Sequence, residues 1–290
     1  MVNSKITFAK TLRLWLQVLF YSIFGCIIYM GISNEYRLSL VYYALFPVTN
    51  NVYWFFTTYI LIFLCIPLIN NGIRSLKNTA LLSLTALFFY CFSLMPTFGN
   101  HIFIDNNRIG VFLTLYMMGA WFRLYGLSFI SRERTNVISL FISLSFIFLC
   151  EWSILTNGWG GDVSSRYRYV WGMEQGLVVV LAFALLVYFS TVKIQSNKII
   201  NIIASTVFGV YLIHMNPLTT NYIWFNLLGI TNWFDNIMMP LYWVVTGVLI
   251  FMICSLIEYL RLMFVDKYTT AIINNSSMVK KVDQFFSKDS

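Results

Sequence analysis

Eight long apolar runs constrain the fold of this chain more than any other feature of its sequence. In hydrocarbon every backbone amide needs a partner within the chain, so a run that crosses a bilayer must be a helix or part of a closed barrel. The alternating segments typical of a membrane barrel are absent from the sequence. We therefore predict an all-α, polytopic integral membrane helix bundle with about eight transmembrane helices. The runs comprise residues 14–31, 52–69, 80–95, 109–127, 137–155, 176–191, 199–215 and 237–257.

The composition supports the same fold class. Only 10% of the residues are charged and 59% are hydrophobic, whereas a soluble globular domain carries roughly a quarter charged residues. That difference excludes a water-soluble fold. An aromatic content of 19%, with only 15 glycines and 5 prolines, also excludes disordered and collagen-like chains.

The basic residues are distributed unequally between the two sides of the predicted bundle. With the N-terminus inside, only four of the 19 Lys and Arg residues fall in outer loops: Arg37, Arg108, Arg166 and Arg168. Because cytoplasmic loops near helix ends are enriched in Lys and Arg, we predict that both termini of this multi-pass membrane protein are cytoplasmic. The same distribution accounts for the net charge of +8. The basic residues form no continuous stripe that could follow the phosphate backbone of a nucleic acid, so no nucleic-acid partner is predicted.

The segments between the runs are short and no internal repeat is visible. The sequence therefore predicts one transmembrane domain over residues 1–266, followed by a polar and loose cytoplasmic tail over residues 267–290. The five cysteines all lie inside apolar runs without C-x-x-C spacing, and we interpret them as packing residues. No metal site and no bound cofactor are predicted.

Ionisable residues inside a membrane are functional candidates because burial at the centre costs at least about 2.5–3.5 kcal/mol. Glu151, in the outer part of the fifth run, is a candidate substrate-binding residue that either faces a cavity or lies at the membrane interface. Glu258 lies near the inner end of the last run, with Arg261 three positions later. Residues at that spacing share one face of a helix, which predicts a local ion pair.

Three arginines lie near the inner end of the fourth run: Arg123, Arg132 and Arg134. Placed together at the cytoplasmic face, they could bind the phosphates of a cytoplasmic donor. The alternative for Arg123 is that its side chain only extends to the membrane surface.

The chain contains only two histidines. His101 lies in an outer loop, and His214 ends the seventh run at the predicted outer surface. A hydrogen-bonded structural role is the alternative for each, but the position of His214 favours a role facing substrate. The outer segment 157–171 combines aromatic residues with two arginines and an aspartate. It fits either sugar rings or the ordinary Trp and Tyr belt of a membrane protein.

Several stretches go beyond generic membrane sequence. YWFFTTYI at residues 53–60 is followed by PLIN at 67–70, and FGVYLIH at 208–214 has a proline just beyond it. KTLRLWLQVLFYS at 10–22 and MMGA at 117–120 belong to the same pattern. Together they resemble the acyltransferase 3 family of integral-membrane acyltransferases, in particular the bacterial branch that O-acetylates surface polysaccharides.

The resemblance implies a membrane-bound acyltransferase that is a multi-pass protein of the cell membrane, the plasma membrane of a bacterium. Such a protein takes an acyl group, usually acetyl, from acyl-CoA as donor co-substrate and delivers it to a hydroxyl of a cell-surface polysaccharide or its lipid-linked precursor. The implied partners are acyl-CoA, the glycan and membrane lipid. Five residues stand at matched motif positions. We expect His214 and Tyr211 to be catalytic, and Tyr53, Trp54 and Asn70 to bind substrate.

One element of the family pattern is missing. The proposed catalytic histidine of the family lies in its first helix, whereas no histidine precedes His101 here. Residues from Lys5 onward resemble the third helix of the family, so its N-terminal helices are expected to be absent. The corresponding expectation is a chain that is inactive alone or completed by another polypeptide.

Other functions remain open from the sequence. A polysaccharide polymerase or a lipid-linked glycan exporter is also polytopic, aromatic and basic on its inner side. Polymerases usually carry a long outer loop and exporters an internal duplication, and neither feature is seen in the sequence. A non-catalytic membrane partner subunit is the third alternative, because the histidine-bearing helix is missing.

Overall fold

The computed structural model describes residues 8–97, 108–126, 141, 144–145, 172–191, 195–233 and 238–288. Its contacts divide the chain into two compact units. The first unit is formed by Asn3–Thr57 together with Gln195–Ser290, and the second by Thr58–Ile194.

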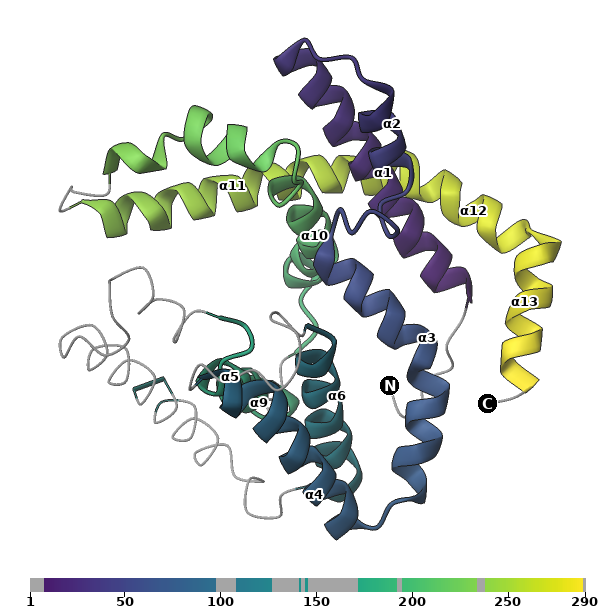
Figure 1. Ribbon diagram of the computed structural model, residues 1–290. Coiled ribbons are helices and arrows are strands. Elements are labelled where there is room, and N and C mark those ends of the chain that lie inside the picture. The colour runs from purple at the N-terminus through teal and green to yellow at the C-terminus, as the bar shows by residue number, and fades with distance from the viewer. Residues whose placement is uncertain are drawn as a thin grey trace. The chain divides into compact units, whose positions relative to one another are not determined.

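The first unit joins the two ends of the chain. Its helix α1 (Phe8–Ser33) is followed by Asn34, which adopts a left-handed backbone with φ of 55° and donates its N–H to Met30 O at 3.0 Å. Asparagine is one of the few residues that tolerate this conformation at the end of a helix. The other elements are α2 (Leu38–Leu45), α10 (Lys198–His214), η2 (Tyr222–Leu227), η3 (Ile230–Trp233), α11 (Met239–Arg261), η4 (Leu262–Asp266), α12 (Lys267–Asn275) and α13 (Ser277–Lys288). Figure 1 shows α11 and α12 as one long rod that α1 crosses.

The second unit contains the middle of the chain. Helix α3 (Trp54–Ser75) begins in the first unit and continues into the second. It is followed by α4 (Asn78–Phe89), η1 (Tyr90–Leu94), α5 (Met95–Thr97), α6 (Arg108–Tyr125) and α9 (Gly176–Thr191). Buried side chains of α3, α4 and α6 form a small core: Ile73, Leu81, Met117 and Ala120. The Trp121 indole N–H also donates to Asn78 Oδ1 at 2.9 Å, which ties the end of α6 to the start of α4.

The fold class predicted from the sequence is confirmed. Every regular element in the described ranges is a helix, and seven of the eight predicted runs correspond to helices there. The run 137–155 lies outside the described residues except for helical positions 141, 144 and 145. Four helices are long and apolar enough to cross a membrane, and α9 and α10 are shorter apolar helices. The chain is an all-α membrane helix bundle.

The polarity of α11 is the reverse of that in a soluble protein. Its surface exposes large apolar side chains, including Val244 at 64% and Met252 at 61%, while Glu258 is fully buried. In water such an apolar face would be a large unfavourable patch, whereas lipid is its natural solvent. The inward-facing charge is likewise the arrangement expected for a helix surrounded by hydrocarbon.

The structure differs from two sequence predictions. Helix α3 continues through Pro67 to Ser75 instead of ending near residue 69; membrane helices tolerate proline because neighbouring groups satisfy the freed carbonyl. The prediction of a loose tail is also wrong, because α12 and α13 are helical over residues 267–288. Ile273 and Val279 are buried, and Asp283 accepts a hydrogen bond from the backbone N–H of Phe8. Apolar residues three or four positions apart give these helices one face, and both helices contact α1.

Candidate functional site

The C-terminal end of α10 carries His214. The helix starts at Asn197, whose side-chain oxygen accepts a hydrogen bond from the backbone N–H of Ile199 at 2.8 Å, a common N-cap arrangement. At the other end, His214 Nδ1 lies 2.6 Å from Val210 O. A carbonyl oxygen can only accept, so Nδ1 carries the proton and Nε2 of the neutral ring has a free lone pair. The imidazole meets the Trp224 ring edge-on, with centroids 6.5 Å apart.

Tyr211 lies one turn before His214, within a group of aromatic rings. Its ring centroid is 6.1 Å from that of Tyr53, 5.5 Å from that of Phe55 and 6.3 Å from that of Phe208. Phe55 lies at the start of α3 and Tyr53 lies just before that helix, whereas Phe208 and Tyr211 belong to α10, far away in the sequence. The sequence-predicted residues Tyr53, Tyr211 and His214 therefore meet at one end of α10.

Tyr53 fixes this end of α10. Its side chain is only 1% exposed, and its hydroxyl donates to Leu212 O at 3.0 Å. The Tyr53 hydroxyl oxygen also accepts a hydrogen bond from Asn216 Nδ2 at 2.8 Å. Because both roles of the hydroxyl are used inside the protein, Tyr53 holds the last turn of α10 in place.

Asn216, which the sequence analysis did not single out, is the connecting residue of this site. Its Nδ2 also donates to the backbone O of Tyr21 in α1 at 3.2 Å, and its Oδ1 accepts from the backbone N–H of Leu218 at 3.0 Å. A Cβ built at Gly25 would overlap the Asn216 side chain. Glycine therefore allows α1 to approach the segment after α10.

A buried carboxylate joins α1 to α11 deeper in the first unit. Glu258 is 0% exposed. It accepts from Gln17 Nε2 at 2.9 Å and from the Tyr21 hydroxyl at 2.6 Å. Arg261 donates Nε and Nη2 to its two oxygens, each at 2.8 Å. The ion pair that the sequence predicts between Glu258 and Arg261 is confirmed, and four donors compensate the cost of burying the charge.

The charged network continues along α1 and the end of the α11 rod. Arg13 donates Nε to Asp266 Oδ1 at 2.9 Å and pairs with its other oxygen. Arg261 Nη1 lies 3.8 Å from the same carboxylate. A Cβ at Gly209 would overlap the Glu258 side chain, so α10 also packs directly against this network. The network therefore links α1, α10, α11 and η4.

A signal for these unpredicted contacts is present in the sequence. Contact residues recur on α1 at every fourth position: Arg13, Gln17, Tyr21 and Gly25. Residues four apart lie on the same side of a helix, so polar or small side chains at this spacing mark a face turned toward protein rather than lipid. The partners on α10 and α11 could not be read from this pattern, because the sequence does not say which helices pack together.

The other predicted residues occupy separate places. Asn70, 8% exposed, accepts a hydrogen bond from the Tyr116 hydroxyl at 2.6 Å within the second unit. Arg123 is exposed in the last turn of α6. Trp54 is the first residue of α3, with its ring 5.9 Å from that of Phe55.

Several predictions fall outside the described residues: Glu151, Arg132, Arg134, His101 and the aromatic segment 157–171. They remain predictions. The four cysteines in the described ranges are free thiols. Among the same residues, no group of three or more His, Cys, Asp and Glu side chains is arranged to hold a metal ion.

The geometry defines a membrane helix bundle in which His214 ends α10 and a buried network around Glu258 and Arg261 packs against the same helix. The sequence model of the acyltransferase 3 family, described as an acyltransferase domain, matches residues 2–259. The chain therefore belongs to the acyltransferase 3 family and is a membrane acyltransferase. Searches of curated proteins and of solved structures found no match.

Proposed function

We propose that the protein transfers an acyl group, acetyl in the first instance, from acyl-CoA to a hydroxyl of a cell-surface polysaccharide or its lipid-linked precursor. Family membership supports the acyl chemistry. The observation that carries the assignment of a site is the His214 side chain, whose Nδ1 hydrogen bond to Val210 O leaves Nε2 as a basic lone pair. Glycan hydroxyls are acceptors that need such a base.

We propose a multi-pass topology in the cell membrane with both termini cytoplasmic. The order of contacts in the first unit supports it. Glu258 contacts Gln17 and Tyr21, and Asp266 contacts Arg13, so the α11 rod runs opposite to α1. Gly209 packs near the same level as Tyr21, while Asn216 lies against Gly25, so α10 runs in the same direction as α1. The predicted first, seventh and eighth spans should have these directions.

In the proposed reaction His214 Nε2 accepts the proton of the acceptor hydroxyl. The oxygen then attacks the carbonyl carbon of the thioester, the C–S bond breaks, and the CoA thiolate leaves and takes the proton back from the imidazolium. The new bond is an O-acyl ester. The Tyr211 hydroxyl is the candidate donor for the developing oxyanion, because it lies one helical turn from His214 on the same side of α10.

Donor binding is assigned to the opposite, cytoplasmic side. Arg123 is exposed at the end of α6, and Arg132 and Arg134 follow it in the sequence. Guanidinium groups suit the phosphates of CoA because they donate two hydrogen bonds with fixed geometry. Trp54, Asn70 and Glu151 are proposed to line the path of the substrate, and Tyr53 to position the end of α10.

The experiment is acyl transfer by the purified protein in lipid vesicles, with acetyl-CoA labelled on the acetyl group. The lipid-linked and surface glycans of the host serve as acceptor. We expect label in the glycan as an alkali-labile ester, together with one free CoA thiol per ester. Vesicles without the protein are the control. The assay is run with the chain alone and with an added polypeptide that carries the N-terminal helices of the family. Absence of labelled ester from every glycan fraction in both arms, with the protein inserted and folded, would contradict the proposal.

A further inference from the structure

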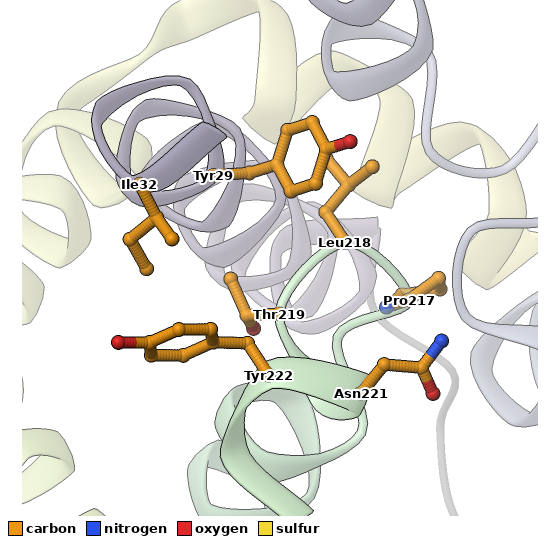
Figure 2. A pocket seen from close by; sticks show the side chains of 7 residues that line it. All are labelled: Tyr29, Ile32, Pro217, Leu218, Thr219, Asn221 and Tyr222. Carbon is orange, nitrogen blue, oxygen red and sulfur yellow. The ribbon is translucent and has the colours of Figure 1, made fainter. Parts of the chain in front are cut away.

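A cavity of about 300 Å³ lies beside the end of α1 and the segment after α10. Figure 2 shows Tyr29 and Ile32 reaching into this region from α1, opposite side chains of the segment that follows His214. The lining residues are Tyr29, Ile32, Pro217, Leu218, Thr219, Asn221 and Tyr222. All of them belong to the first unit.

The contacts already described build this cavity. Tyr29 follows Gly25 by four positions on α1, so it continues the face of the helix that packs against Asn216. Asn216 in turn caps the next segment: its backbone O accepts from Thr219 N–H at 3.1 Å, and its side chain accepts from Leu218 N–H. One side of the cavity is therefore formed by α1. The other side is formed by the segment after α10, which Asn216 holds in place.

The lining combines flat rings with unused hydrogen-bonding groups. Within the described residues, the Tyr29 hydroxyl, the Asn221 amide and the Tyr222 hydroxyl make no hydrogen bond. Ile32, Pro217 and Leu218 add apolar surface. A sugar ring presents both a C–H face, which packs on aromatic rings, and a rim of hydroxyls, which need such donors and acceptors.

The size of the cavity limits what it can hold. About 300 Å³ is the lower end of the range for small-molecule sites, about 300–1,000 Å³. It suits one sugar ring rather than a longer oligosaccharide. The lining segment starts three positions after His214, and by the proposed topology it faces outward, where an acceptor glycan is found.

We propose that this cavity binds one sugar ring of the acceptor glycan and presents a neighbouring hydroxyl to His214. This assignment rests on the proposed function for its biological meaning. Tyr29 and Tyr222 supply ring surfaces, while the Asn221 amide and the two tyrosine hydroxyls recognise the hydroxyl pattern. These side chains then determine which sugar is accepted.

The test measures binding without any acyl donor. The full chain in lipid nanodiscs is titrated with methyl glycosides of glucose, galactose, rhamnose and N-acetylglucosamine, and bound probe is detected by saturation-transfer NMR. We expect at least one glycoside to bind, and Asn221→Leu and Tyr222→Leu each to weaken it tenfold or more. Tyr36→Leu is the matched control, because Tyr36 is 75% exposed and lies outside the cavity; its affinity should not change.

Two results would overturn the assignment. One is that none of the four glycosides binds although the thermal midpoint shows a folded protein. The other is that a glycoside binds equally well to the wild type and to both cavity variants. Binding at the cavity without any acetyl-CoA-dependent transfer would instead reject the proposed function and leave the cavity as a sugar site.

Discussion

At the scale of single residues, the proposed chemistry depends on the tautomer of one imidazole. The Val210 carbonyl orients the His214 ring through Nδ1 and leaves Nε2 for the substrate. That carbonyl belongs to the preceding turn of the same helix, so the orientation requires only that α10 remain helical up to its last residue. The Tyr53 hydroxyl holds that last turn through its hydrogen bond to Leu212 O, and Asn216 donates to the same hydroxyl.

Replacing His214 by alanine should therefore lower kcat for acetyl transfer by about 10²–10⁴-fold, because a positioned general base typically contributes that much. The acceptor KM should change little. The measurement is steady-state transfer of labelled acetyl groups in vesicles. Met215→Ala is the control, since Met215 is the next residue and is 41% exposed; it should keep wild-type turnover. A normal kcat in the His214 variant would show that the residue is not the general base and has only a structural role.

The contrast between local and distant contacts explains which residues could be predicted. The pair Glu258 and Arg261 was predictable because three positions along a helix place two side chains on one face. Gln17 and Tyr21 donate hydrogen bonds to the same Glu258 carboxylate, yet they are more than two hundred positions away from it in the sequence. Their role depends on α1 packing against α11, and hydropathy places helices in the membrane without pairing them.

At the scale of elements, α10 approaches Glu258 closely only because residue 209 has no side chain. A Cβ there would overlap the carboxylate-bearing side chain, which is itself held by four hydrogen bonds. Glu258 therefore cannot move away cheaply. Small residues at such contacts are the usual way in which membrane helices pack closely.

Gly209→Ala should destabilise the protein by about 1–3 kcal/mol, the typical cost of overpacking a rigid interior. Gly247→Ala is the matched control on α11, because no described atom lies within 4 Å of a Cβ at that position. It should be neutral or slightly stabilising, since alanine favours a helix over glycine by about 1 kcal/mol. The free energy of unfolding in mixed micelles measures both. Equal stability of the two variants would disprove the close contact.

The charged network should be far more sensitive than a surface ion pair. Glu258→Gln removes the negative charge that Arg261 contacts at 2.8 Å and leaves the longer 3.8 Å contact to Asp266. Removing one partner of a buried ion pair costs about 3–5 kcal/mol. The control is Glu35→Gln, whose exposed partner Arg37 lies 3.4 Å away; such a pair contributes about 0–1 kcal/mol.

Thermal unfolding of both variants in the same lipid supplies this comparison. A midpoint for Glu258→Gln within the range of the Glu35→Gln control would mean that the buried network does not hold α1 to α11.

Helix positions were more predictable than helix ends. The apolar run 14–31 corresponds to α1 and the run 199–215 to α10 because length and hydropathy alone identify a membrane helix. The continuation of α3 beyond the predicted end at residue 69 was missed, because the cost of Pro67 inside a helix depends on neighbouring groups that the sequence does not locate. The tail was interpreted as loose from its polar composition, but the fit of Ile273 and Val279 to their neighbours is a tertiary effect.

At the scale of the whole molecule, the proposed topology places the loop before α3 outside and the C-terminal helices inside. Single cysteines introduced into a background without native cysteines test it. Tyr36→Cys should react with a membrane-impermeant maleimide added to intact cells, because this residue is 75% exposed after α1. Tyr268→Cys, 70% exposed on α12, should react only after permeabilisation. Labelling of both from outside would rule out the arrangement.

The most direct measurement uses the two faces of the membrane separately. Proteoliposomes are sorted into one orientation with the Tyr36→Cys label, labelled acetyl-CoA is supplied only to the cytoplasmic face, and the glycan acceptor only to the other. The account predicts acetyl ester on the glycan, formed across an intact bilayer and lost with His214→Ala. Transfer only when donor and acceptor share one face, or transfer that survives loss of the imidazole, would contradict it.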